Sequence, residues 1–406
     1  MNLKLLLLGG LVLLFFFLAM SEKWSKRIFY ITVVMFVVRK LEIQPIGDIT
    51  PAAYITVLLF LLVVSKDFGI LRKWWVYISF LAVSLVIGWL GPQPDRAFAW
   101  EFPLLVTMMI AVIAEFMLKT EEDLTVFARC IIAICAVFSI ATIMGYLGLA
   151  DGTVIMAPNV SADDMYNSRV CGITSSNLIN IACVASITLL PTAKLKYSWM
   201  EWLVIGITMY AALITVKRMT FIAMLLALIY YVTHQIQNGH KNAAIAIAIL
   251  VVVLIPVFWK NFAYRFAIAG IGGENDLTDG SSLSRIYRAS LAIDAFLQSP
   301  IIGKGAGFVI YIHNGLFEIL GNCGLLGVFS ILLRLFPRLK DVVKLNPWAA
   351  AIFIFSAIGL MLEATLNITQ LMAFGGMFLG GYFVSRKLNI DYSTDTQKCE
   401  ETDLQS

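Results

Sequence analysis

Charged side chains are scarce in this sequence. Only 14% of its 406 residues are Asp, Glu, Lys or Arg, whereas 60% are hydrophobic. A soluble domain carries roughly 25% charged residues, so the composition excludes a soluble globular protein of this length. The formal net charge is +4 and no long run of like charges occurs, which gives no indication of a nucleic-acid-binding surface.

Residues that bind metals or form disulfides are also few. The chain has six cysteines and three histidines, and no two cysteines form a Cys-x-x-Cys pair. Without such spacing, neither a zinc site nor a disulfide framework is indicated. Asp163-Asp164 could bind a divalent cation, but adjacent acids on a hydrophilic loop are usually just solvated. We expect no metal and no cofactor.

Long apolar runs dominate instead. A transmembrane α-helix needs about 20 predominantly apolar residues, and lipid admits only elements whose backbone hydrogen bonds are internal. The sequence therefore predicts an all-α polytopic membrane protein with about 12 transmembrane helices. The first run lacks a small-x-small cleavage site, so we expect a retained span. The runs are approximately 3–20, 28–38, 53–65, 75–91, 104–118, 130–149, 173–192, 199–215, 219–233, 243–259, 315–336, 348–366 and 368–384.

Lysine and arginine predict the orientation, because they concentrate in cytoplasmic connections. Most fall on alternating connections, which we assign to the cytoplasm; Arg39-Lys40 is the exception. The opposite connections are 92–103, 150–172, the tight turn at Lys217-Arg218, and 260–314. The cytoplasmic groups are Lys23, Lys26, Arg27, Lys66, Arg72, Lys73, Lys119, Arg129, Lys194, Lys196, Lys241, Arg334, Arg338, Lys340, Lys344, Arg386 and Lys387.

This pattern divides the chain into four parts. Residues 1–259 hold the first ten spans, joined by short loops except for the external loop at about 150–172. Residues 260–314 form a long external loop, where we expect the chemistry. Residues 315–385 hold the last spans, and 386–406 form a cytoplasmic tail.

Basic residues in the external connections run against the orientation rule. They are therefore expected to meet anionic partners, and phosphates are the obvious anions at a membrane. The alternative is that they snorkel to lipid headgroups. The turn at Lys217-Arg218 has almost no loop, so its charges belong at the interface or in a water-filled cavity. The full set is Arg169, Lys217, Arg218, Arg265, Arg285, Arg288 and Lys304.

Apolar residues at helical spacing predict an amphipathic helix over 283–297. Arg285 and Arg288 are three residues apart, on neighbouring parts of one face, and arginine holds phosphate oxygens through bidentate bonds. Pro300 is expected to end the helix. The glycines that follow permit a tight return whose backbone N–H groups could also face an anion. They are Gly303, Gly305 and Gly307.

His313 is the candidate for proton transfer. Imidazole is the side chain best matched to this task near neutral pH, and His313 lies on the external side at the mouth of a span. His234 and His240 fall in a polar cytoplasmic loop. The alternative for His313 is a helix cap or a place in the headgroup layer. Glu318 follows Asn314 by four residues on one helical face, where it could orient the neighbourhood of His313 or hold an arginine.

Small residues, mostly glycines, lie close in sequence to His313 and to Arg169. Gly321, Gly324 and Gly327 recur every three residues, a pattern that permits close helix contact. Arg169 precedes Gly172 and a run of small and polar residues, so we expect its loop to re-enter the membrane.

In their order, these residues resemble the superfamily of O-antigen polymerases and O-antigen ligases, which are bacterial envelope glycosyltransferases. Its C-terminal signature is an arginine-bearing amphipathic segment, Pro-x-x-Gly-x-Gly, His-Asn, and an apolar helix with Gly-[IL]-[IL]-Gly. The loop of Arg169 and the turn at Lys217-Arg218 are similar too, and the likeness covers about half the chain. This chain supplies Arg285, Pro300-Ile-Ile-Gly303-Lys-Gly305, His313-Asn314 and Gly324-Leu-Leu-Gly327 in that order.

The resemblance implies a GT-C-type glycosyltransferase of the bacterial inner membrane, active at its periplasmic face. Donor and acceptor would be glycans linked to undecaprenyl diphosphate, with a chain-length regulator and a flippase as candidate partners. His313 would act as base, and Arg285 and Arg218 would stabilise the departing diphosphate, so that no metal need be required. The expected substrate-binding residues are Arg169, Arg288, Lys217, Lys304, Asn314 and Glu318.

Two departures from the family pattern favour a polymerase over a ligase. Val216-Lys217-Arg218-Met219 stands where ligases usually have Ser-Arg-Gly, and the insertion that ligases carry before His313 is short here. We therefore expect polymerisation of lipid-linked repeat units into O-antigen or a related surface polysaccharide. A ligase that transfers the glycan to lipid A core is the nearest alternative. A transporter or flippase is a third, although the sequence has no internal repeat to support it.

Overall fold

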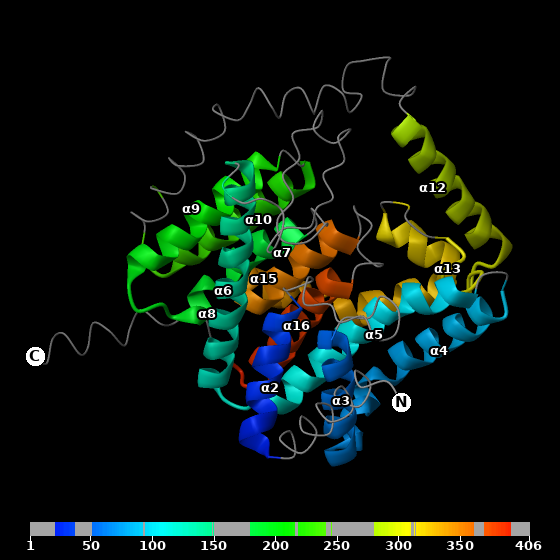
Figure 1. Ribbon diagram of the computed structural model, residues 1–406, viewed down its shortest axis with the longest axis horizontal. Coiled ribbons are helices and arrows are strands. Elements are labelled where there is room, and N and C mark those ends of the chain that lie inside the picture. Colours follow the sequence, from blue (N-terminus) through cyan, green and yellow to red (C-terminus); the bar gives the residue numbers. More distant parts are fainter. Residues whose placement is uncertain are drawn as a thin grey trace, which may run out of the picture.

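A computed structural model describes residues 21–36, 51–91, 94–147, 149, 179–215, 218–240, 245, 280–309, 312, 314–360 and 369–390. Every element within these ranges is helical, which confirms the predicted all-α class for the described part of the chain (Figure 1). The elements are α2 (Glu22–Met35), α3 (Pro51–Lys66), η2 (Phe68–Trp74), α4 (Trp75–Trp89), α5 (Pro94–Met117), α6 (Glu121–Tyr146), α7 (Ile179–Ala185), η4 (Ser186–Leu189), α8 (Leu190–Ala193), α9 (Ser198–Ile214), α10 (Arg218–Gln237), α12 (Gly280–Gln298), α13 (Gly315–Leu335), α14 (Leu339–Val343), α15 (Pro347–Ile354), η7 (Phe355–Leu360) and α16 (Thr369–Lys387).

Five helical segments of the described chain are long and apolar enough to cross a membrane. Four further apolar helices have only 10–17 residues, which accounts for part of the difference from the 12 spans expected. The apolar run 3–20 lies outside the described residues, as does 243–259 except for residue 245. The long segments are Phe68–Trp89, Pro94–Met117, Glu121–Tyr146, Met219–Gln237 and Gly315–Val343. Large apolar side chains on their surfaces, such as Trp75 and Trp89 at 64% and 62% exposure, support a multi-pass membrane protein.

The expected external connection 92–103 is mostly helix. α5 begins at Pro94, with Asp95 in its first turn, and it buries Trp100 and Glu101 before the apolar run starts at 104. Proline suits the first turn of a helix because its missing N–H needs no partner there. Pro103 lies inside α5 and obscured this start, since proline in a helix interior is usually a breaker.

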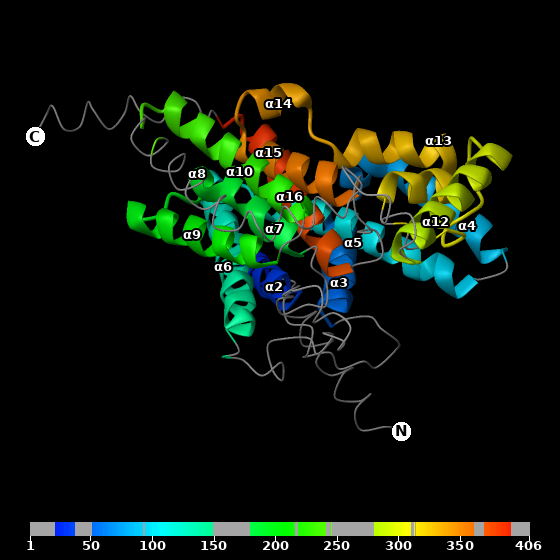
Figure 2. The same cartoon turned by 90° about the horizontal axis from the view of Figure 1, so that it is seen from above.

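The centre of the bundle is formed by α16 packed along α5 (Figures 1 and 2). Gly376 and Gly380 lie four residues apart and bring α16 against Thr107, Ala111 and Ala114 of α5. The hydroxyl of Thr107 donates a hydrogen bond to the backbone oxygen of Met372, at 2.9 Å. In both views α4, α12 and α13 lie on one side of this centre, and α6, α8 and α9 on the other.

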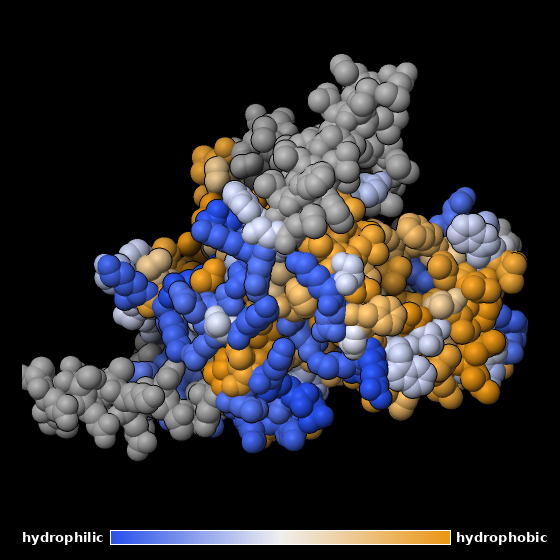
Figure 3. Space-filling model, turned by 90° about the horizontal axis from the view of Figure 1, so that it is seen from below, coloured by the Kyte–Doolittle hydropathy of each residue, from blue (hydrophilic) through white to orange (hydrophobic). Residues whose placement is uncertain are grey.

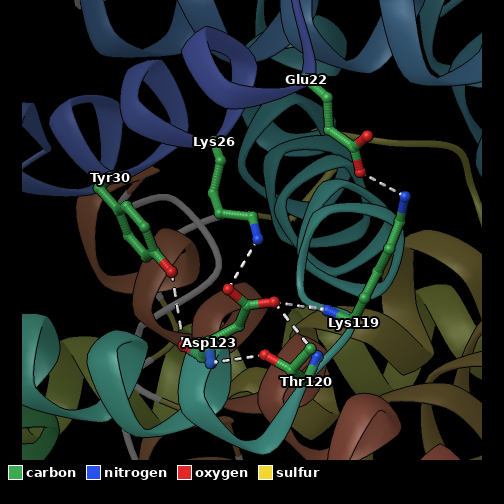
Figure 4. Close-up of polar contacts among 6 residues, drawn as sticks. All are labelled: Glu22, Lys26, Tyr30, Lys119, Thr120 and Asp123. Atoms are coloured by element: carbon green, nitrogen blue, oxygen red, sulfur yellow. Dashed lines mark hydrogen bonds and ion pairs between the residues drawn. The ribbon is translucent and has the colours of Figure 1, made fainter.

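Ion pairs gather the ends of several helices at one end of the bundle, which we call the basic end. Asp123 closes a capping box with Thr120 at the start of α6 and accepts from Lys26 of α2 at 2.7 Å (Figure 4). Lys119 pairs with Glu22 at 2.5 Å, and this hydrogen-bonded charge holds the pKa of the Glu22 carboxyl below its usual range. Basic groups from alternating connections therefore lie together.

Two more ion pairs belong to the basic end. Lys194 bonds to Glu121 at 2.7 Å, and Lys73 pairs with Glu115 near the end of α5. Figure 3 views the face that carries the start of α6, and hydrophilic side chains gather over much of it. The same face turns hydrophobic towards α4. This division is that of a membrane protein with one polar end and lipid-facing flanks.

Candidate functional site

The structure describes the predicted site residues only in part. His313, Arg169 and Lys217 lie outside the described residues, as do the side chains of Arg218 and Arg285. α9 ends at Ile214 with Thr215 as its C-cap, and the backbone of Arg218 begins α10. The two residues between them, 216 and 217, lie outside the described residues. Side chains are described for Arg288, Lys304, Asn314 and Glu318.

The predicted amphipathic helix is α12. It buries Ala292 and Ala295 and leaves Tyr287 and Leu297 exposed at 64% and 69%. Small side chains on the buried face let α12 approach α13, where a side chain on Gly321 would stand 3.2 Å from the Cα atom of Ala292. Arg288 is partly buried on this helix.

The turn after α12 begins next to Pro300. The helix ends at Gln298, and the backbone N–H of Ser299 still donates to Ala295 at 3.1 Å. Pro300 then ends the helix as predicted, because it has no N–H to continue the pattern. The chain turns back along α13 from this point.

A break in α13 receives this turn. Gly324 has φ 61° and ψ −158°, a conformation essentially restricted to glycine. It separates α13 into two arms, and Figure 1 shows the helix bending there. The N–H groups of Leu325 and Leu326 therefore cannot reach their helical acceptors. They donate instead to the backbone oxygens of Pro300 and Ile301, at 2.8 and 3.0 Å.

The exchange of hydrogen bonds is reciprocal. The helical acceptors that Leu325 and Leu326 leave behind are the backbone oxygens of Gly321 and Asn322. These accept from the N–H groups of Lys304 and Gly305, at 3.0 and 2.8 Å. The turn thus satisfies all four backbone groups that the break exposes. We call this unit of residues 300–305 and 321–326 the interlock.

The interlock corrects two expectations. The N–H of Gly303 donates to Ser299 at 2.9 Å and that of Gly305 to Asn322, so neither faces an anion as we had expected. Gly324 was expected to serve close helix contact, as Gly321 does. It instead permits a break, because only glycine adopts its backbone angles without strain.

Asn322 is a site residue that the sequence did not reveal. Its fully buried side chain accepts from the N–H of Val309 at 2.7 Å and donates to the backbone oxygen of the same residue at 2.8 Å. This paired contact fixes Val309, at the end of the glycine turn, against α13. An asparagine within an apolar run was the available signal, since lipid-embedded amides need partners.

Asn314 begins α13. Its side-chain oxygen accepts from the N–H of Phe317 at 3.1 Å, and its backbone oxygen accepts from Glu318. An asparagine cap of this kind satisfies helix donors that lack internal partners. Glu318 lies one turn further along and is fully buried. The two residues therefore hold the start of α13, directly after His313 in the chain.

Glu101 on α5 is a second residue that the sequence missed. Only 1% of it is exposed, and neither carboxyl oxygen has a hydrogen-bond partner among the described residues. Its neighbours include Ser84, whose hydroxyl lies 3.1 Å from the sulfur of Cys323 in the interlock. Its place in the expected loop 92–103 concealed it.

Replacing Glu101 tests whether this carboxyl is held by a partner. We expect Glu101→Met to raise the thermal unfolding midpoint in detergent, because a buried polar group without a hydrogen bond costs about 1–3 kcal/mol. Glu122→Met on the exposed start of α6 is the matched control and should change stability by less than about 0.5 kcal/mol. A lowered midpoint for Glu101→Met would show that the carboxyl stabilises the fold.

Metal ligands do not cluster in the described ranges, where no group of three or more His, Cys, Asp or Glu side chains could hold an ion. Asp163-Asp164 lies outside these ranges. No protein-family model matches the chain, and a search of curated proteins found no match to it.

Proposed function

We propose that this protein polymerises oligosaccharide repeat units carried on undecaprenyl diphosphate into O-antigen or a related surface polysaccharide. The growing glycan would be transferred from its lipid diphosphate to a sugar hydroxyl of an acceptor repeat unit. The reaction would take place at the periplasmic face of the bacterial inner membrane. The positive-inside rule supports this orientation, since the basic end would face the cytoplasm.

The interlock is the observation that carries the proposal. Two motifs of the family resemblance, Pro300–Gly305 and Gly324–Gly327, meet at the break in α13, where Leu325 and Leu326 donate to the backbone oxygens of Pro300 and Ile301. Motifs that are separate in the chain are thus parts of one unit. This unit joins the arginine-bearing helix α12 to α13, whose cap Asn314 directly follows His313.

The chemistry assigns a role to each group. The acceptor hydroxyl must lose a proton as it attacks the anomeric carbon, and His313 is the base that accepts it. The bond from the anomeric carbon to the diphosphate oxygen breaks, and negative charge grows on the leaving group. Arg285 and Arg218 stabilise that charge, with help from Arg169 and Arg288. Direct attack inverts the anomeric centre.

The remaining residues bind rather than react. Lys217 and Lys304 add positive charge for the diphosphate, at the turn before α10 and in the glycine turn. Asn314 and Glu318 hold the start of α13 and so support the position of the segment that contains the base. Their proposed role in substrate binding rests on the family resemblance.

Surface polysaccharide from a strain that lacks the gene tests the proposal. We expect lipid A core that carries single repeat units, because ligation continues when polymerisation stops. Polymer that accumulates on undecaprenyl diphosphate would instead identify a ligase. Repeat units retained on the inner leaflet would identify a flippase. Complementation with the intact gene should restore long chains and serves as the control.

A further inference from the structure

Two neighbouring cavities open at the basic end and share Arg386. The first has a volume of about 360 Å³ and lies between η2, α5, α13 and α16. The second, of about 640 Å³, lies between α10, α14 and α16. We call them together the basic-end pocket. Its charged side chains are Lys73, Glu115, Arg334, Lys340, Asp341, Lys344, Arg386 and Lys387.

Positive charge prevails in the basic-end pocket, with six basic and two acidic side chains. Both acids are already engaged. Glu115 pairs with Lys73, while Asp341 accepts from the hydroxyl of Tyr382 at 2.6 Å and lies 3.5 Å from Nε of Arg386. Within the described chain, the other four basic groups form no ion pair: Arg334, Lys340, Lys344 and Lys387. A surplus of cations therefore faces the pocket.

Apolar side chains border these cations on the outer surface. Leu339 and Val343 are 67% and 71% exposed and flank Lys340 in the short helix α14. Inside the first cavity, the guanidinium of Arg334 lies over the ring of Trp74, 5.9 Å from its centre. Aromatic and apolar groups mixed with cations are typical of the membrane interface.

We propose that the basic-end pocket binds the phosphate groups of an anionic phospholipid in the leaflet that this end faces. Basic pockets between transmembrane helices bind such headgroups. The exposed apolar border favours a lipid over free phosphate, because acyl chains would cover Leu339 and Val343. Since each cavity offers cations on one side of Arg386, a headgroup with two phosphates, as in cardiolipin, suits the pocket. This site lies apart from the glycine turn and α12.

Lipid binding can be measured on the full-length protein in nanodiscs of phosphatidylcholine with and without cardiolipin. We expect cardiolipin to raise the thermal unfolding midpoint and to remain bound in native mass spectrometry. The double variant Lys340→Gln/Lys344→Gln should bind cardiolipin roughly 30-fold more weakly, since each cation near an anionic surface contributes about a factor of five. Both lysines are solvent-accessible and form no ion pair within the described residues, so this variant should fold.

Matched controls make the result specific. Lys23→Gln/Lys196→Gln removes two exposed cations of the basic end that do not line the pocket, and it should bind cardiolipin as the wild type does. Equal binding by the pocket variant and the wild type would overturn the proposal. An equal midpoint shift with inorganic phosphate alone, or equal midpoints with and without cardiolipin, would also overturn it, because the first would show a site for free phosphate and the second no preference for anionic lipid.

Discussion

His313→Ala should abolish polymer elongation while the protein remains folded and inserted. Loss of a general base lowers the rate roughly 10²–10⁴-fold, enough to remove the long chains of a surface polysaccharide. Folding should survive because the described cap at the start of α13 is provided by Asn314, which this variant retains. Gel analysis of polysaccharide length, with the amount of protein in the membrane fraction, measures both effects.

His240→Ala is the matched control for this prediction. His240 is exposed, follows α10, and lies on a connection that we assign to the cytoplasm. Its replacement should leave chain length unchanged. Wild-type chain lengths in His313→Ala would remove the histidine from the mechanism. A loss of membrane-inserted protein in that variant would show that His313 supports folding instead.

Gly324→Ala should unfold the interlock and strongly destabilise the protein. A side chain at φ 61° and ψ −158° costs about 1–3 kcal/mol. The new Cβ atom would also stand 2.6 Å from the carbonyl group of Ile301, which adds about 1–3 kcal/mol of overpacking. We expect a clear fall in the thermal unfolding midpoint in detergent, and loss of activity with it.

Gly206→Ala provides the comparison. Gly206 lies within α9, and a Cβ atom there would meet nothing within 4 Å. Alanine is favoured over glycine in a helix by about 1 kcal/mol, so this variant should be as stable as the wild type or slightly more so. Equal stability of the two alanine variants would mean that the break at Gly324 is not constrained as described.

Most helices could be predicted from the sequence because long apolar runs indicate membrane spans and basic residues indicate the ends of those spans. The start of α5 could not be predicted from the sequence, because a proline such as Pro103 usually breaks a helix. The short helices were equally hidden. Apolar composition does not show that Ile179–Ala193 is divided among α7, η4 and α8.

The candidate site was predictable where periodicity is local. Helix α12 and its end before Pro300 follow from spacing within some twenty residues. The interlock does not, because it joins backbone groups of the turn to acceptors and donors about twenty residues away. Glycines spaced by three predict packing equally well at Gly321 and Gly324, and only the partner segment distinguishes contact from a break. Glu101 was missed because the helix that buries it was itself missed.

The pairing of α5 with α16 has a consequence for biogenesis. These two helices form the middle of the bundle, yet about 250 residues separate them in the chain. The ribosome therefore delivers α5 to the membrane long before its main neighbour exists. Until α16 follows, the small-residue face of α5 at Ala111 and Ala114 must be covered by lipid or by the insertion machinery. Final closure is thus a late, post-insertional step.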